Sequence, residues 1–202
     1  IYNYKENTLI YNDIEFHGTG SELHNVAFCK YNLVSFFNNS GSIVGECTID
    51  TASFHGKDGT ILGNDTIKAA LFYEGGGKLS NSNHIIEIAV FHDDGLIDGN
   101  NKIDTALFFG KGGINGGNTI DTTIIYNEAI ISGENTIRTT TLLGDGKFEG
   151  DNIFNDLTFS KMCSYYLENN HTQTIINNFN AIGSCTGPII IHSDENTQQA
   201  KI

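Results

Sequence analysis

The sequence repeats itself in two adjacent stretches of 17 residues. Residues 119–135 read TIDTTIIYNEAIISGEN, and residues 136–152 read TIRTTTLLGDGKFEGDN. Residues 85–101 (IIEIAVFHDDGLIDGNN) and residues 102–118 (KIDTALFFGKGGINGGN) precede them with the same pattern. Four consecutive units of one length indicate a repeat architecture, in which each unit stacks on the next.

Less regular copies flank these four units. Residues 48–65 and 66–84 form units of 18 and 19 residues, and the extra residues fall in their glycine-rich parts, where a loop absorbs them. We therefore expect irregular N-terminal coils over residues 1–30 and regular repeats over residues 31–152. Residues 153–202 would form the last coils and a capping or continuing region.

Residue type depends on the position within the unit, counting Thr119 as position 1. Position 2 is Ile or Phe in every unit from 48 to 170, and position 7 is Phe, Ile or Leu. In the four regular units, position 15 holds Gly99, Gly116, Gly133 and Gly150, and position 17 holds Asn101, Asn118, Asn135 and Asn152. This alignment predicts an apolar interior and corners made by Gly and Asn, the residues that adopt positive φ most readily.

The predicted fold is all-β: a single-stranded parallel β-helix, or β-solenoid, with coils of 17–19 residues. A helical-hairpin repeat needs about 33 or more residues and helix-forming residue types. Stacked coils about 4.8 Å apart would instead turn each position into a ladder along the axis. We favour a right-handed coil over a left-handed hexapeptide solenoid, because no apolar residue recurs strictly every six positions.

Composition narrows the partners of the chain. Its 202 residues include 11 Lys and Arg against 24 Asp and Glu, a net charge of −13, which argues against nucleic-acid phosphates. No apolar run reaches the roughly 18 residues of a membrane span. The chain begins with IYNYKENTLIY and ends with TQQAKI, and neither end resembles a natural terminus, so we expect it to be joined to the rest of a longer chain.

The four cysteines match no zinc pattern, and no cofactor is expected. Cys29 and Cys47 are one coil apart, whereas Cys163 and Cys185 lie in the last unit and the region after it. We predict a disulfide for each pair, and hence an oxidising, extracytoplasmic location. Buried free thiols are the alternative for the first pair.

Position 3 carries the most chemically promising side chains. It lies beside the inward position 2 and should face solvent. Carboxylates gathered with a basic residue act as acid and base in carbohydrate-active enzymes. The residues that would form such a site are Glu87, Asp104, Asp121 and Arg138. The alternative is a solvated face of alternating charge, in which Asp121 pairs with Arg138 across two coils.

Two further ligands are weighed and disfavoured. The acidic turns at residues 93–95 and 144–146 are the candidates for Ca²⁺, but they lack the spacing of known calcium loops and are more typical of turns. Columns of Thr at positions 1 and 4 could suit ice, but both are broken and charged residues interleave with them.

The end of the chain, residues 152–195, carries a second pattern. It consists of Asn152, Phe154, Asp156, Leu157, Thr158, Phe159, Tyr166, Leu167, residues 172–175, Asn177, Gly183, Cys185, Pro188, Ile189 and Ile191. These residues resemble a pattern in very large cell-surface proteins of Bacteroidota, including gliding-motility adhesins exported by type IX secretion. Residues 160–165 depart from the usual Gly-Lys turn, which leaves the exact family open.

The resemblance implies an extracellular, cell-surface location, with the secretion machinery and surface polysaccharide as partners. It also implies O-glycosylation at Asp-Thr sites followed by a small or aliphatic residue. The threonines concerned are Thr51, Thr66, Thr105 and Thr122. The alternative is that these threonines only pack in strand ladders.

Three hypotheses for function follow. The first is a non-catalytic segment of a secreted surface adhesin, serving as a rigid spacer or as a surface- or glycan-binding wall, with a role in gliding motility. The second is a carbohydrate-active enzyme, a polysaccharide lyase or hydrolase that uses the position 3 face. The third is a segment of a phage fibre.

Overall fold

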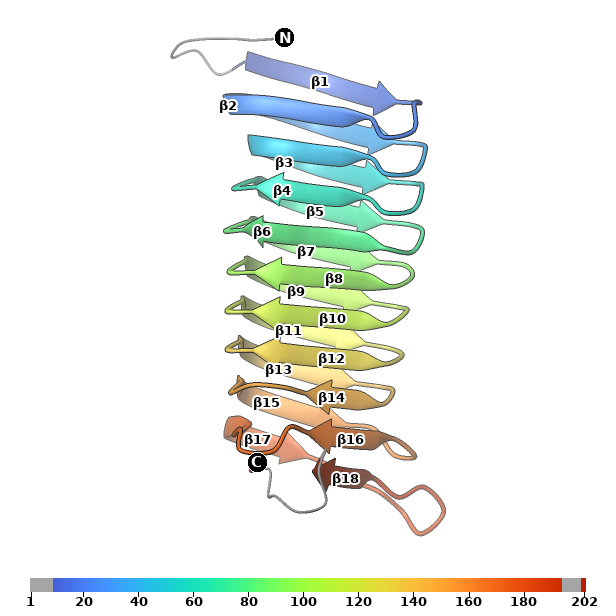
Figure 1. Cartoon of the computed structure of the whole chain (residues 1–202), viewed down its shortest axis with the longest axis vertical. Helices are drawn as coiled ribbons and strands as arrows, with labels where there is room; N and C mark the ends of the chain where they lie inside the picture. The colour runs from blue at the N-terminus through green and yellow to red at the C-terminus, as the bar shows by residue number, and fades with distance from the viewer. Residues whose placement is uncertain (1–8, 194–200) are drawn as a thin grey trace.

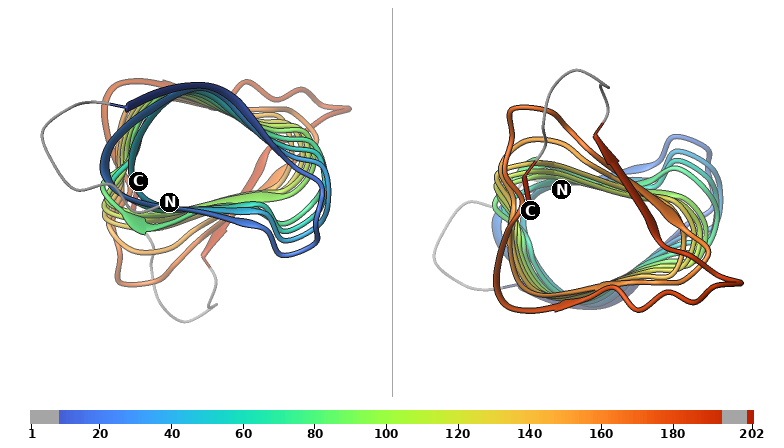
Figure 2. Two further views of the ribbon diagram at one scale, coloured as in Figure 1. Left: turned by 90° about the horizontal axis from the view of Figure 1, so that it is seen from above. Right: turned by 90° about the horizontal axis from the view of Figure 1, so that it is seen from below.

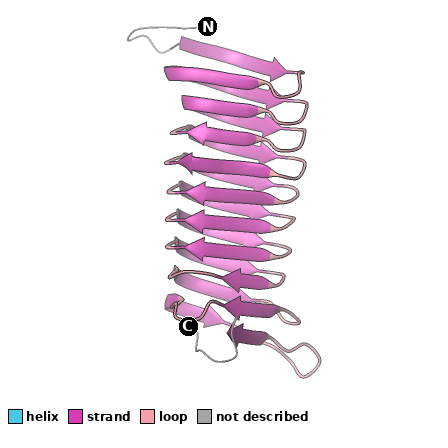
Figure 3. Cartoon of the chain, viewed as in Figure 1, coloured by secondary structure: helices cyan, strands magenta, loops and turns pink. Residues whose placement is uncertain are grey.

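The structure is a β-solenoid, as the repeat predicts. The computed structural model describes residues 9–193 and 201–202, and these contain strands, turns and no helix (Figure 3). Accordingly, the described residues include no helix that could cross a membrane. In Figure 1 the nearer strands run to the left and the farther strands to the right as the chain descends, so the coils wind in the right-handed sense.

Each coil contributes strands to two faces, and the strands within each face are parallel. Seen along the axis in Figure 2, the backbone of the stacked coils forms a flattened ring. The first face contains β1 (Leu9–Phe16), β5 (Thr66–Phe72), β7 (Ile85–Phe91), β9 (Lys102–Phe108), β11 (Thr119–Ile125), β13 (Thr136–Leu142), β15 (Ile153–Phe159) and β17 (Thr174–Asn180). The second contains β4 (Thr60–Gly63), β6 (Gly77–Ser82), β8 (Gly95–Gly99), β10 (Gly112–Gly116), β12 (Ala129–Gly133), β14 (Gly146–Phe148), β16 (Ser164–Leu167) and β18 (Ile190–Ser193). β2 (Glu22–Phe36) and β3 (Ser42–Phe54) are long enough to pass from the second face to the first.

Equivalent residues lie in register along each face. Ile120 is the Cα partner of Ile103 on one side and of Ile137 on the other. These isoleucines are buried, as are the apolar residues at positions 7 and 13 of the regular coils. The predicted apolar ladders inside the coil are therefore confirmed.

Position 7 forms a stack of phenylalanine rings in the lumen. The rings of Phe16, Phe36, Phe54, Phe72, Phe91 and Phe108 follow one another with centroids 4.6–5.0 Å apart and almost parallel planes. Stacked aromatic pairs contribute about 0.5–1.5 kcal/mol each beyond the area that they bury. This stack ends at Ile125 and Leu142, which occupy the same column.

Inward glycines on the second face make room for these rings. A Cβ on Gly59 would lie 2.6 Å from Cγ of Phe54, and a Cβ on Gly77 would lie 2.6 Å from Cγ of Phe72. Where Ile125 replaces phenylalanine, the inward residue of the same coil is Ala129. In these coils a small residue on the second face therefore packs opposite the large ring of the first face.

The buried asparagines at position 17 tie the coils together at one corner. The Oδ1 of Asn118 accepts hydrogen bonds from the backbone N–H (3.0 Å) and the side-chain amide (2.9 Å) of Asn101. The amide of Asn118 in turn donates to Oδ1 of Asn135 and to the backbone carbonyl of Asn115. Because buried amides need all these partners, the ladder stabilises the corner and its spacing.

Asp65 and His84 replace asparagine in this ladder in the 18- and 19-residue units. Both side chains are fully buried. Asp65 Oδ1 accepts from the backbone N–H of Cys47 at 2.9 Å, and His84 Nδ1 accepts from the backbone N–H of Asp65 at 3.3 Å. The ladder thus runs past the four regular units toward the N-terminus.

Glycine at position 15 is required by the backbone. Gly116 has a φ of 105°, and a Cβ there would overlap the carbonyl oxygen of Gly99 in the preceding coil. Only glycine combines this conformation with so close an approach. The predicted glycine corner is therefore confirmed.

The ends of the solenoid are less regular than its centre. β1 pairs with β2 over a coil of 20 residues (Leu9 to Cys29), and the register of β2 and β3 shifts between Asn25 and Cys29. At the other end β17 continues the first face, with a register shift opposite Phe154 and Asp156. Most of β17 is exposed, including Ile176 and Phe179.

Replacing Gly59 with alanine should destabilise the fold by about 1–3 kcal/mol, since the added methyl group overpacks against Phe54. The measurement is thermal unfolding followed by circular dichroism. Gly113→Ala is the matched control, because its Cβ would approach only the movable end of Leu96, at 2.8 Å. Equal losses of stability in the two variants would contradict the idea that Gly59 makes room for the ring of Phe54.

Replacing Asn118 with leucine should cost about 1–3 kcal/mol for each buried group that loses its partner. The groups concerned are the N–H of Asn101 and the carbonyl of Asn115, whereas Oδ1 of Asn135 keeps the hydrogen bond from the backbone N–H of residue 118. The control is Asn115→Ala, which removes an exposed amide that bonds Asp98 at 2.8 Å. Chemical denaturation should show a large loss for Asn118→Leu and a change within about 0.5 kcal/mol for the control.

Candidate functional site

The position 3 residues form an exposed column on the first face. Glu87, Asp104, Asp121 and Arg138 are all exposed, and they belong to consecutive coils. Arg138 donates to both oxygens of Asp121, at 3.1 Å and 3.3 Å, which raises the pKa of Arg138. Lys68 pairs with Asp50 at 2.8 Å at the other end of the column.

Ion pairs lie at the two ends of this column, and Glu87 and Asp104 stand between them. Such exposed pairs contribute little to stability and are screened by salt. Within residues 9–193 and 201–202, no group of three or more His, Cys, Asp or Glu side chains is arranged to hold a metal ion. The pairing of Asp121 with Arg138 is confirmed.

The disulfide prediction is not supported, because none of the four cysteines forms a disulfide in the structure. Cys29 and Cys47 are in-register partners on adjacent coils, as their spacing predicts, and both are buried. Cys163 directs its Sγ to the carbonyls of Leu143 and Lys161, at 3.7 Å and 3.6 Å, while Cys185 is exposed in the following loop. Spacing therefore located the cysteines correctly but did not decide their oxidation state.

The acidic turns bind backbone groups of the next coil. Asp94 Oδ1 accepts from the N–H of Lys111 at 2.8 Å, and Asp145 Oδ1 accepts from the N–H of Ser164 at 2.7 Å. These bonds fit the turn interpretation of residues 93–95 and 144–146.

The threonines of the Asp-Thr sites differ in exposure. Thr66 is exposed, whereas Thr51, Thr105 and Thr122 are half-buried within the position 4 ladder. Thr66 follows Asp65, whose side chain is fully buried. Of the four proposed O-glycosylation sites, Thr66 has the most accessible side chain.

A ladder of exposed rings at position 8 was missed in the sequence. It consists of His17, Phe37, His55, Tyr73, His92, Phe109 and Tyr126, whose successive centroids lie 4.7–5.5 Å apart in stacked geometry. Because each interior ring is covered on both faces by its neighbours, it presents its edge to solvent. The signal was available, since one position holds a planar ring in seven coils, but the residue names differ.

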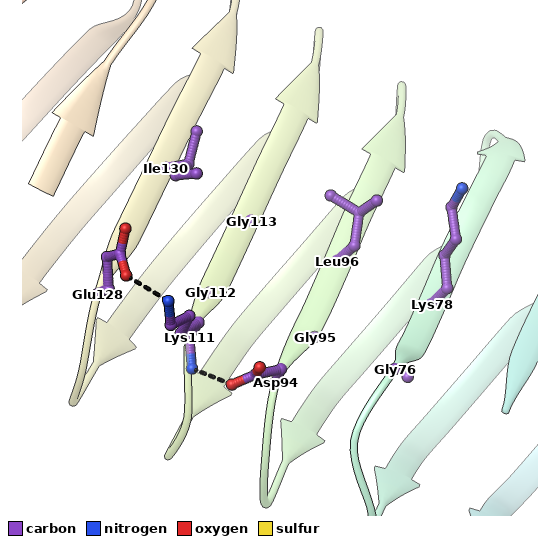
Figure 4. Close-up of a pocket in the computed structure, with 11 residues that line it drawn as sticks. Gly76, Lys78, Asp94, Gly95, Leu96, Lys111, Gly112, Gly113, Glu128 and Ile130 are labelled. Atoms are coloured by element: carbon purple, nitrogen blue, oxygen red, sulfur yellow. Dashed lines mark hydrogen bonds and ion pairs between the residues drawn. The ribbon is translucent and has the colours of Figure 1, made fainter. Parts of the chain in front are cut away.

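A groove on the outer side of the second face was also missed. It has a volume of about 370 Å³ and crosses β6, β8, β10 and β12. Figure 4 shows Leu96 and Ile130 on either side of Gly113, which has no side chain to fill the space between them. The lining also includes Asp94, Lys111 and Glu128, which lie along one side in Figure 4, and Lys78, which lies beyond Leu96.

The charged groups around the groove are partly paired. Lys111 Nζ lies 2.6 Å from Glu128 Oε2, and the hydrogen bond together with the charge of Glu128 raises the pKa of Lys111. Asp94 holds the backbone N–H of Lys111, as noted above. In the described part of the chain Lys78 makes no ion pair.

The fold and these surfaces define the class of the protein as a right-handed parallel β-solenoid. Comparisons of the chain with protein-family models, with curated proteins and with solved structures find no match.

The last coils contain a carboxylate bound by several amides. Asp156 accepts from Asn178 at 2.6 Å, from Asn177 at 2.9 Å and from Asn155 at 2.7 Å. These hydrogen bonds, that of Asn178 first, and the charge of Arg138 hold the pKa of Asp156 below its ordinary value of 3.8. The cluster joins β15 to β17 at the irregular end of the solenoid.

Asp156 should make the stability of this end depend on acid. Its lowered folded pKa means that its contribution is present above the unfolded value of about 3.9 and is lost as the pH falls through the folded value. Thermal unfolding measured from about pH 6 downward should therefore show a smaller acid-induced loss for Asp156→Asn than for the parent chain. Asn178→Ala should act in the same direction, and an unchanged pH profile in both variants would contradict the assignment.

Proposed function

We propose that the chain is a non-catalytic, rigid segment of a secreted cell-surface adhesin. The observation that carries this proposal is the continuous parallel pairing of strands from coil to coil along the axis. On the first face it runs from β1 to β17, and between Phe16 and Phe108 it is accompanied by a stack of phenylalanine rings. Each coil is held by its neighbours, so that such an array transmits force and gains length by adding copies.

The surface location rests on the resemblance of residues 152–195 to the ends of β-helical units in Bacteroidota surface proteins. The residues that carry this resemblance include Phe154, Leu157 and Phe159, which pack inside the coil on β15. Export through a type IX machinery, contact with surface polysaccharide and a role in gliding are part of the same proposal.

The enzymatic alternative finds less support in the geometry. An active site needs its acid and base to converge on one reacting bond. Here the position 3 carboxylates are spread along an exposed ladder, and Asp121 is paired with Arg138. The groove lies on the other face and is lined by neither Glu87, Asp104 nor Asp121.

The proposal predicts that an antibody against this chain labels intact cells of the source organism. Labelling only after lysis would contradict a surface location. The isolated chain should also show no turnover on a panel of neutral and acidic polysaccharides. Turnover that is lost in Asp104→Ala or Asp121→Ala would instead establish the enzyme, and a trimeric mass in solution would favour the fibre hypothesis.

A further inference from the structure

The groove beside Gly113 results from a departure from the repeat. On the second face, the residue that follows the inward position points outward. These outward residues are in register from coil to coil and form a column. It contains Ser42, Thr60, Lys78, Leu96, Gly113, Ile130, Lys147, Tyr166 and His192. Gly113 is the only member of this described column without a side chain.

The fold does not require glycine at position 113. Its φ is not positive, unlike that of Gly116 at the corner. It faces outward, so it does not make room for the ring stack as Gly59 and Gly77 do. A Cβ there would meet only Cδ1 of Leu96, the end of a flexible side chain. Backbone conformation or packing therefore explains Gly59, Gly77 and Gly116, whereas neither explains Gly113.

The walls of the groove offer apolar contact and polar groups together. Leu96, Ile130 and the bare backbone of Gly112 and Gly113 form its centre. Around them stand two lysines and two carboxylates, among which Lys111 and Glu128 are paired at 2.6 Å. The two positive and two negative charges cancel, which makes the groove locally neutral in a chain of net charge −13.

We propose that this groove binds a neutral saccharide unit of a surface glycan. A pyranose ring has an apolar C–H face, which suits Leu96 and Ile130, and a rim of hydroxyl groups that both donate and accept. Lysine donates, carboxylates accept, and hydrogen bonds to charged groups are the stronger ones. A volume of about 370 Å³ is near the lower end of small-ligand sites, of the order of one or two sugar rings.

The negative charge of the chain disfavours anionic glycans as ligands. A polyanion would approach an acidic molecule and would find, in the groove, the carboxylates of Asp94 and Glu128 beside the lysines. The exposed ring ladder is the weaker candidate for sugar binding, because its interior rings stack on one another and their faces are covered. The groove would be the glycan-binding site of the proposed adhesin, and in that respect the inference rests on the proposed function.

The test is binding of soluble sugars to the ¹⁵N-labelled chain, followed by nuclear magnetic resonance. The probes are D-glucose, D-galactose, D-mannose and cellobiose, with D-glucuronate as the anionic counterpart. We expect at least one neutral sugar to shift the amide resonances of Leu96, Gly113 and Ile130. Gly113→Leu should fill the groove and weaken binding by at least about tenfold.

Matched variants make the result specific. Ser42→Leu adds the same side chain to the same column outside the groove and should leave binding unchanged. If Gly113→Leu proves misfolded by circular dichroism, Glu128→Gln takes its place, since it removes a charged acceptor and frees Lys111 without adding bulk.

Four results would each overturn the site. They are the absence of shifts with every neutral sugar, tighter binding of D-glucuronate, shifts that map away from the groove, and full affinity in folded Gly113→Leu or, where it takes its place, in Glu128→Gln. Because the assay uses the isolated chain, its failure leaves the cell-surface location standing, and an intracellular location would leave the affinity of the groove unaffected.

Discussion

In-register stacking of parallel strands is the constraint on which the rest of this molecule depends. Every residue lies one strand spacing, about 4.8 Å, from its equivalents above and below. A position inside the coil therefore favours residues that can stack on the equivalent residues of the adjacent coils. Phenylalanine rings stack, and the asparagine amides donate to one neighbour while accepting from the other. The same constraint places glycine at the position 15 corners, where Gly99, Gly116, Gly133 and Gly150 take a positive φ.

A second constraint acts within each coil, across the lumen. Interiors are packed to a nearly constant density, so in the coils that hold the phenylalanine stack each ring on the first face lies opposite a small residue on the second. Phe72 faces Gly77, and the coil with Ile125 has Ala129 in place of glycine. Near the C-terminal end Tyr165 enters the lumen and stacks on Phe159 at 3.6 Å, and burial raises the pKa of its hydroxyl. The ladders along the axis and the pairs across it together leave the inward positions little freedom.

These constraints explain how much could be predicted from the sequence. The solenoid, its coil length and its inward positions were correctly predicted, because stacking forces similar residues to recur at equal spacing. The pairing of Asp121 with Arg138 followed from the same spacing. The ring ladder was missed because His, Phe and Tyr share planarity and not identity, so that a search for repeated letters does not detect it. The groove was missed because it arises where Gly113 has no side chain. Only the register of the second face shows that every neighbouring coil has a side chain at this position.

The disulfide prediction is not supported, because repeat spacing determines which residues are neighbours and says nothing about bond formation between them. The same distinction applies to function. Inward columns are occupied by what the fold needs, and a regular outward column such as position 3 is explained by solvation and ion pairing. An outward residue that breaks its column without a structural reason is therefore the most informative kind of residue in a solenoid. Gly113 meets that condition, since neither its backbone conformation nor its packing requires glycine. The space that it leaves is bounded by apolar and charged side chains of neighbouring coils, so a binding site can arise in a repeat protein without any added loop.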